Sequence, residues 1–360
     1  KFTNFNRYQF RTNIDTDVAD WLHIMSDVRL ARTKRHNAEV DLGRSINYSP
    51  TIRELKNPET GIYNDDAWNN IDHNPYAAVA TRDMNDYHNY VFGNINFLFN
   101  ITEGLTFSLQ GGINYNDNPY YDVQSASRYP GATSSMENRN DKYLSWQNTN
   151  NLTYSKKFGD HSLTAMGVLE LSSDEWSRIR ITGNNLLTET VGYWNVGLAS
   201  TRNPENGYTA SSMVSALGRV QYGYKGKYLL TASLRADGAS KFQESNKWGY
   251  FPSGALAWNI AEEDFMKDLG TFQQLKLRAS AGVIGNQAID AFETLGMLKS
   301  ETYAYGTSTK YTGYWANTVA TPNVQWERTN QYDVGVDFSI LNQKLNVTID
   351  WFLKDTKNLL

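Results

Sequence analysis

Apolar and polar residues alternate with a period of two along almost the whole chain, and this pattern constrains the fold more than any other feature. In the segment 105–115, LTFSLQGGINY, the odd positions are apolar except for Gly111, and the even positions are polar apart from Gly112. Because successive side chains of a β-strand point to opposite faces, such a segment has one apolar face and one polar face. The same alternation recurs at 228–236, 275–283, 332–340 and 345–353. The sequence therefore predicts an all-β protein.

The alternating segments group into hairpins. Alternation and turn residues together predict about six hairpins, and hence about twelve antiparallel strands. The predicted hairpins cover residues 5–30, 87–116, 143–176, 212–237, 248–284 and 331–354. Their predicted internal connections are 15–19, 100–104, 156–161, 225–227 and 341–344, with a longer connection at 261–274 in which 262–266 suits a helical turn.

The connections between the predicted hairpins are long, in contrast to those within them. The main ones are 31–86, 118–142, 177–211 and 285–330. Successive turns of an antiparallel sheet lie at opposite ends, so we expect the short turns at one end and the long loops at the other. Outer-membrane barrels have this asymmetry, with short periplasmic turns and long extracellular loops. The spacing thus predicts a segment of an antiparallel transmembrane β-barrel, although a soluble lectin-like protein could show it by chance.

The composition agrees with this prediction and excludes several other classes. Aromatic residues, which favour strands, make up 13% of the chain, with 23 Tyr and 10 Trp. The balance of 34 Lys+Arg against 38 Asp+Glu includes no basic block, so nucleic acid is not an expected partner. The absence of Cys excludes a disulfide framework and a cysteine nucleophile. No apolar run approaches the roughly 18 residues that a membrane-spanning helix requires.

We predict no catalytic, cofactor or metal site, and therefore no enzyme. The paired carboxylates at 65–66 and 262–263 suit solvated positions better than the two acids of a glycosidase. Asp237 could be a Ca²⁺ ligand or form an Asx turn, and turn chemistry favours the turn. No glycine pattern for nucleotide binding opens a helix. The histidines, none of which has metal-ligand spacing, are His23, His36, His73, His88 and His161.

Aromatic side chains within the long connections are the candidate ligand-binding residues. Rings stack on the apolar faces of sugars, and the neighbouring Asn, Ser and Thr residues supply hydrogen bonds, so the mixture suits carbohydrate or peptide ligands. Packing of loops against one another is the alternative for each residue. A separate group, Tyr222, Tyr224 and Tyr228, surrounds a short turn, as in an interfacial aromatic girdle. The candidate binding residues are Tyr120, Tyr121, Tyr129, Tyr193, Trp194, Tyr303, Tyr305 and Trp315, with Tyr311 and Tyr314 nearby.

The segment 215–287 contains a series of short motifs in a fixed order. They are LGRVQY at 217–222, KYLLTAS at 227–233, RADGASKF at 235–242, WGYFPS at 248–253, AW at 257–258, EDFM at 263–266, LKLRAS at 275–280 and GNQ at 285–287. With these motifs the segment resembles the SusC/RagA family of TonB-linked outer-membrane proteins. Weaker similarity extends over nearly the whole chain and includes TKNLL at 356–360, where Asn358 replaces the usual Asp.

The resemblance implies that residues 1–360 are a central-to-late part of a plugged barrel of about 22 strands. We expect the plug domain, the TonB box and the final strands to lie outside this sequence. The family further implies import of glycans or oligopeptides across the outer membrane, driven by TonB and assisted by a SusD-like lipoprotein lid, with no cofactor. A passive porin or surface adhesin is the alternative. A soluble carbohydrate-binding or hydrolytic β protein is the third possibility.

Overall fold

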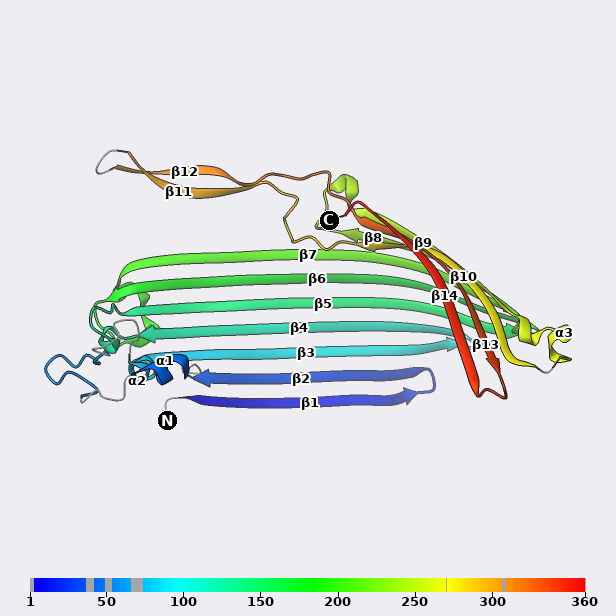
Figure 1. The fold of residues 1–360 in the computed structure, drawn as a ribbon, viewed down its shortest axis with the longest axis horizontal. Helices are drawn as coiled ribbons and strands as arrows, with labels where there is room; N and C mark the ends of the chain where they lie inside the picture. The colour runs from blue at the N-terminus through cyan, green and yellow to red at the C-terminus, as the bar shows by residue number, and fades with distance from the viewer. Residues whose placement is uncertain are drawn as a thin grey trace.

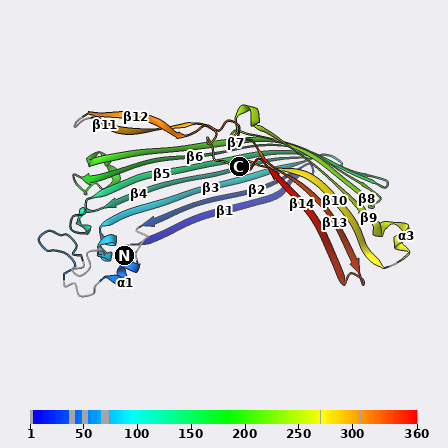
Figure 2. The same cartoon turned by 45° about the horizontal axis from the view of Figure 1, so that its top comes forward.

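The computed structural model describes residues 3–36, 42–48, 54–65, 74–269, 271–305 and 309–359. Twelve strands form one curved antiparallel sheet, in which sequence neighbours lie side by side (Figures 1 and 2). Their order is β1-β2-β3-β4-β5-β6-β7-β8-β9-β10-β13-β14, and β11 pairs with β12 in a separate hairpin. The predicted all-β, antiparallel architecture is confirmed.

The strands differ greatly in length. Those of the main sheet are β1 (Asn4–Ala19), β2 (Leu22–His36), β3 (Arg82–Thr102), β4 (Leu105–Gln124), β5 (Ser135–Phe158), β6 (His161–Leu186), β7 (Ala199–Tyr224), β8 (Tyr228–Ala239), β9 (Trp248–Asn259), β10 (Phe272–Asn286), β13 (Glu327–Ile340) and β14 (Leu345–Lys357). The separate hairpin comprises β11 (Met297–Tyr305) and β12 (Thr309–Thr318).

The helical elements are short and lie in the connections. None of the helices in the described ranges is long and apolar enough to cross a membrane. The α-helices are α1 (Leu42–Asn47), α2 (Pro75–Ala80) and α3 (Asp264–Lys267), and the 3₁₀ turns are η1 (Ala126–Arg128), η2 (Gly192–Trp194), η3 (Val196–Leu198), η4 (Glu244–Asn246) and η5 (Ile260–Glu262).

Apart from 260–271, which contains η5 and α3, the connections are sorted by length between the two ends of the sheet, as the sequence predicts (Figure 1). Gly104 in the β3–β4 turn has a φ of +76°, and a Cβ there would lie 2.2 Å from the carbonyl oxygen of Ser155, so this turn requires glycine. The connections 20–21, 103–104, 159–160, 225–227, 260–271 and 341–344 lie at one end, and 37–81, 125–134, 187–198, 240–247 and 287–326 lie at the other.

Several predicted boundaries are wrong. The first turn lies at 20–21 and not at 15–19, because β1 continues to Ala19. Much of the predicted loops 118–142 and 177–211 is strand, since β4 ends at Gln124 and β6 at Leu186. Polar side chains on both faces remove the period-2 signal there, although the backbone ladder continues. The predicted loop 285–330 contains the β11–β12 hairpin.

The register gives the sheet one apolar face and one polar face. Phe99, Phe107, Leu152 and Gly167 are cross-strand partners on the apolar face of β3–β6. In β4 the outward-pointing apolar residues run from Leu105 to Tyr115, about 11 residues, which is the length that a tilted strand needs to cross hydrocarbon. The neighbouring even positions of β4 belong to the polar face.

An aromatic belt follows the short-turn end of the apolar face. The rings of Tyr224 and Tyr228, which are paired across the β7–β8 turn, have centroids 6.5 Å apart. Tyr228 in turn stacks on Trp258 at 6.4 Å, and on β3 and β4 Phe99 stacks on Phe107 at 6.0 Å. This arrangement is typical of an interfacial girdle.

A small hydrophobic core lies on the polar face, where the connections of β8, β9 and β13 meet. Ala239, Phe242, Phe251 and Trp326, which we call the inward core, are all buried. The Trp326 ring lies 5.1 Å from that of Phe242 and 5.4 Å from that of Phe251. Phe251 points to the polar face because its cross-strand partner is Arg235. The motifs at 235–242 and 248–253 therefore supply most of this core.

Candidate functional site

Strands β3 to β7 continue well beyond the apolar band, and we call this part the distal wall. In β4 the continuation comprises 116–124, about 9 residues or ~30 Å of strand. Both faces of the distal wall carry polar and aromatic side chains. Its segments are 82–90 of β3, 116–124 of β4, 135–143 of β5, 174–186 of β6 and 199–210 of β7.

The polar face of the distal wall carries a row of charged side chains. Asp86, Tyr120, Arg139, Arg180 and Glu205 are successive cross-strand partners on β3 to β7. Arg180 donates to Glu205 at 3.1 Å, and Arg139 lies with its guanidinium 4.5 Å from the centre of the Tyr120 ring. Contacts within the row therefore link Arg180 to Glu205 and Arg139 to Tyr120, whereas Asp86 accepts from Arg35 at 2.8 Å.

Further ion pairs flank this row and fix the same face. Arg82 donates to both carboxylate oxygens of Asp122, at 2.8 and 3.0 Å, and to the Tyr120 hydroxyl at 3.2 Å. Arg178 pairs with Asp141. Bidentate guanidinium–carboxylate pairs hold both partners in a defined plane. The distal wall thus presents a rigid polar surface around the Tyr120 ring, and the Trp176 ring lies on the same face, 5.2 Å from the Arg178 guanidinium.

Sequence reasoning missed these charged residues. Their signal was present, because Glu137, Arg139 and Asp141 alternate with other residues, as do Arg178 and Arg180. Charges spaced by two positions lie on one face of a strand. That signal could not be used while 118–142 and 177–211 were predicted to be loops.

Tyr129 lies at the outer rim of the same region. It follows η1 and lines a cavity of about 430 Å³ together with Arg82, Gln124 and Arg128. The Arg128 guanidinium is 5.2 Å from the centre of the Tyr129 ring. Tyr120 and Tyr129 are therefore both placed close to arginine side chains.

Tyr121, Tyr193 and Trp194 meet on the opposite face. The Tyr121 ring stacks on Tyr193 at 4.8 Å, with an interplanar angle of 20°, and Trp194 lies 4.9 Å from Tyr193. Asn138 donates to the Tyr193 carbonyl at 2.9 Å, so the 187–198 connection is held against the apolar side of the sheet. Burial raises the pKa of Tyr193. Tyr120 and Tyr121 are separated because adjacent strand residues point to opposite faces.

The remaining candidates lie on the β11–β12 hairpin, apart from the main sheet (Figures 1 and 2). Tyr303 pairs with Tyr311 across the hairpin, and Trp315 lies under the Lys299 ammonium at 5.8 Å. Tyr303 and Trp315 are exposed, and Tyr305 ends β11. The structure therefore divides the predicted binding residues among three surfaces and does not form one site from them.

Two carboxylates differ from their predicted environments. Asp237 lies inside β8, where its Oδ2 accepts from Arg235 Nε at 2.8 Å, so the predicted Asx turn is wrong. Glu263 is not simply solvated, because it accepts hydrogen bonds from Lys227, Tyr228 and Trp258. The Lys227 ammonium and the two neutral donors lower the pKa of Glu263 to about 2. Asp237 lies in a strand and not in a turn because the backbone of β8 is paired on both sides.

Within the described ranges, no group of three or more His, Cys, Asp and Glu side chains could hold a metal ion. His73 and Asp66 lie outside the described residues. A cavity of about 570 Å³ on the polar face is lined by Arg219, Arg235 and Phe251 among others, which suits polar ligands or solvent.

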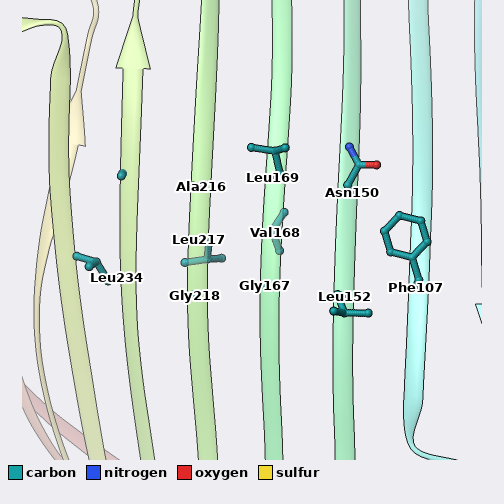
Figure 3. Close-up of a pocket in the computed structure, with 11 residues that line it drawn as sticks. Phe107, Asn150, Leu152, Gly167, Val168, Leu169, Ala216, Leu217, Gly218 and Leu234 are labelled. Atoms are coloured by element: carbon teal, nitrogen blue, oxygen red, sulfur yellow. The ribbon is translucent and has the colours of Figure 1, made fainter. Parts of the chain in front are cut away.

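The apolar face has a shallow groove of its own. Figure 3 shows Gly167 and Gly218, which are cross-strand partners, between Phe107, Leu152 and Leu234. The groove has a volume of about 590 Å³ and is almost wholly apolar. A Cβ at either glycine would meet nothing within 4 Å. This depression lies within the apolar band, where hydrocarbon can fill it, and the amide of Asn150 is the only polar side chain among its lining residues (Figure 3).

Residues 27–360 match the family described as TonB dependent receptor-like, beta-barrel. The TonB-dependent receptor P3 of Formosa agariphila is 30% identical over 374 residues, which cover 99% of this chain and 37% of that relative. The TonB-dependent receptor SusC of Bacteroides thetaiotaomicron is 36% identical over 155 residues, covering 42% of this chain and 16% of SusC. The chain therefore spans about 37% of the length of the Formosa agariphila receptor P3.

Among solved structures, the RagAB peptide transporter is similar in fold. Its matching chain superposes with a TM-score of 0.77 at 18% identity, covering 98% of this chain and 40% of the other. At this identity the likeness concerns the fold alone.

Proposed function

Because this chain belongs to the family of TonB-dependent receptor-like β-barrels, we propose that it forms a large part of the barrel of an outer-membrane importer for glycans or oligopeptides. The family is one of outer-membrane receptors and transporters and not a class of enzymes. The similarity of this chain to SusC confirms the family resemblance that the sequence motifs indicate.

One observation carries the proposal: the polar face of the distal wall is rigid, charged and aromatic beyond the apolar band. If the apolar band lies in the membrane, this face lines the mouth of the barrel above the outer leaflet. Tyr120 and the guanidinium of Arg139 then lie where an incoming ligand first meets the wall. Aromatic rings and fixed hydrogen-bonding groups are the usual lining of sites for sugars and peptides.

The proposed transport step requires no covalent chemistry. Ligand held against the polar face of the distal wall is enclosed by a SusD-like lipoprotein lid. A plug that fills the barrel then opens when TonB pulls on it, and the ligand moves inward. In this proposal β1 and β14 pair with further strands of the receptor, because an open sheet edge in lipid leaves backbone groups without hydrogen bonds.

The β11–β12 hairpin has a separate proposed role. An isolated two-stranded hairpin is at best marginally stable in water. Tyr303 and Trp315 are exposed on it, which suits contact with the lid or with ligand held beneath the lid.

A matched pair of variants tests the proposal in the full-length receptor. We expect Tyr120→Ala to reduce uptake of a labelled ligand, because it removes the ring from the proposed entry surface. Tyr121→Ala is the control: it removes the same side chain at the next position, which points to the other face. Equal losses of uptake in both variants, or no loss in either, would contradict the assignment.

A passive porin or an adhesin would behave differently. Uptake through a porin continues when the proton-motive force is abolished, whereas TonB-driven uptake stops. Purification of the receptor in mild detergent adds a second criterion, because the proposed importer retains a SusD-like lipoprotein and a porin or adhesin is recovered alone.

A further inference from the structure

The apolar face changes its chemistry in a fixed order from the short turns towards the distal wall. Each row is a set of cross-strand partners on β1 to β5, so its members lie side by side. The last apolar row comprises Phe10, Leu30, Val91, Tyr115 and Leu144. The next row comprises Tyr8, Arg32, Asn89, Asp117 and Lys142. Polar and cationic residues therefore begin directly beyond the apolar band.

The cations on this face differ from those on the polar face. Arg32 and Lys34 are exposed, and their heads lie 5.7 and 5.4 Å from the centre of the Tyr87 ring. Within the described ranges neither of them has an ion-pair partner. On the polar face of the same wall, Arg139 and Arg180 are paired with carboxylates. Positive charge is thus neutralised on one face and left available on the other.

Acids moderate this charge without removing it: Asp117 and Asp83 lie among these strands, and Glu175 on β6 is the cross-strand partner of Leu144. Asp117 stands opposite Lys142, but their side chains form no ion pair among the described residues. Asp83 lies 3.7 Å from His36, beyond the two cations. Arg32, Lys34 and Lys142 therefore outnumber the unpaired acids on this part of the face.

Aromatic rings follow beyond the cations. Tyr121 is the cross-strand partner of Asn138, farther from the short turns than Lys142, and it carries the stacked Tyr193 ring. Trp194 completes the group and is 78% exposed, so most of its ring is free for contact. Since these rings point away from the proposed ligand path, import of ligand does not account for them.

We propose that this face binds a phosphorylated glycolipid of the outer leaflet. Its acyl chains follow the apolar row, its phosphates meet Arg32 and Lys34, and its sugar rings stack on Tyr121, Tyr193 and Trp194. The order of the layers on the protein matches the order of hydrocarbon, phosphate and sugar in such a lipid. A phospholipid lacks the sugars and would leave the outer rings without contacts. The inference rests on the membrane orientation in the proposed function.

Lipid retention by the purified full-length receptor tests the proposal. The probe is lipopolysaccharide, added to the delipidated receptor in mild detergent and quantified by native mass spectrometry. We expect the double variant Arg32→Gln, Lys34→Gln to bind it about tenfold more weakly, the loss expected when two solvent-exposed charge contacts are removed. Lys225→Gln, which removes one positive charge at the short-turn end, serves as the control and is expected to bind as the unmodified receptor does.

Four further measurements make the outcome decisive. Binding of dephosphorylated lipopolysaccharide should no longer depend on Arg32. The variant Trp194→Ala should bind lipopolysaccharide more weakly but phosphatidylglycerol as well as the unmodified receptor does. Equal binding by the double variant, or equal competition by phosphatidylglycerol, overturns the proposal. Cross-links from position 194 to a second copy of the receptor, in place of lipid contacts, also overturn it.

The proposal and the import function can fail separately. The double variant at Arg32 and Lys34 is expected to import ligand normally, since neither residue touches the polar face. If uptake proves independent of Tyr120 while lipid retention still depends on Arg32, the import assignment fails and the glycolipid site stands.

Discussion

The distal wall of β3–β7 and the region of β8, β9, β10 and β13 complete the same sheet in different ways. In the distal wall the strands continue past the apolar band, and ion pairs such as Arg180–Glu205 join neighbouring strands. In the second region the strands stop early, and their connections fold onto the polar face around Trp326. A strand that leaves the membrane can therefore be stabilised either by its own ladder or by a buried core.

The two solutions have different energetic characters. A core buries apolar area and stabilises all the segments that contribute to it. Ion pairs between partly exposed side chains contribute little each, because water screens them. We therefore expect damage to the inward core to weaken the whole region, and damage to the distal wall to remain local.

The largest expected effect comes from Trp326→Ala. Replacement of a buried Trp by Ala typically costs about 3–5 kcal/mol through lost burial and the cavity that remains. Urea unfolding of the receptor in detergent measures the change. Trp315→Ala, on the exposed β11–β12 hairpin, is the control and should change the midpoint little. Similar shifts in both variants would show that the inward core does not stabilise this region.

A smaller and local effect is expected for Arg180→Ala. Its pairs with Glu137 and Glu205 link β5, β6 and β7, and exposed pairs are each worth about 0–1 kcal/mol. Hydrogen exchange should become faster in 135–143 and 199–210, with no change around Trp326. Faster exchange in both regions would mean that the two regions unfold together.

Deletion of residues 297–318 tests whether the β11–β12 hairpin supports the main sheet. The hairpin of β11 and β12 forms its own two-stranded sheet, so its deletion with a short glycine linker should leave the unfolding midpoint nearly unchanged. We expect the deletion to weaken retention of the lipoprotein lid instead. A large loss of stability would show that the hairpin supports the sheet, and unchanged lid retention would remove its proposed role.

The smallest expected effect depends on pH and concerns Glu263. The folded-state pKa is lowered from 4.5 to about 2, so the carboxylate stabilises the β9–β10 turn above pH 4.5. That contribution is lost as the pH falls from about 4.5 towards 2, where the folded protein takes up the proton. Glu263→Gln should remove this part of the acid response in the stability of the turn. An unchanged acid profile would contradict the assignment.

The sequence predicted the strands whose two faces differ. Segments 105–115 and 332–340 alternate cleanly because one face is apolar, and both are strands in the structure. The distal wall has polar side chains on both faces, so alternation could not reveal it. The motif at 235–242 was recognised, but its convergence with Trp326 depends on contacts across 80 or more positions in the chain and cannot be seen locally.

The candidate site was predicted only in part. Tyr121, Tyr193 and Trp194 were singled out and do come together. Their placement opposite Tyr120 required the knowledge that 118–124 is a strand. Once that is known, the alternation of faces separates the two tyrosines without further information.

In the proposed membrane orientation, one face of this sheet lies in lipid and the other faces the interior of the barrel. Because residues 1–360 include no Cys, single-cysteine variants at positions 106–113 can each carry one fluorophore on this part of the receptor. Quenching by brominated lipid in reconstituted membranes should be strong at Phe107, Leu109 and Ile113 and weak at Thr106, Ser108 and Gln110. Uniform quenching along this segment, or no quenching at any position, would contradict the proposed orientation of the two faces.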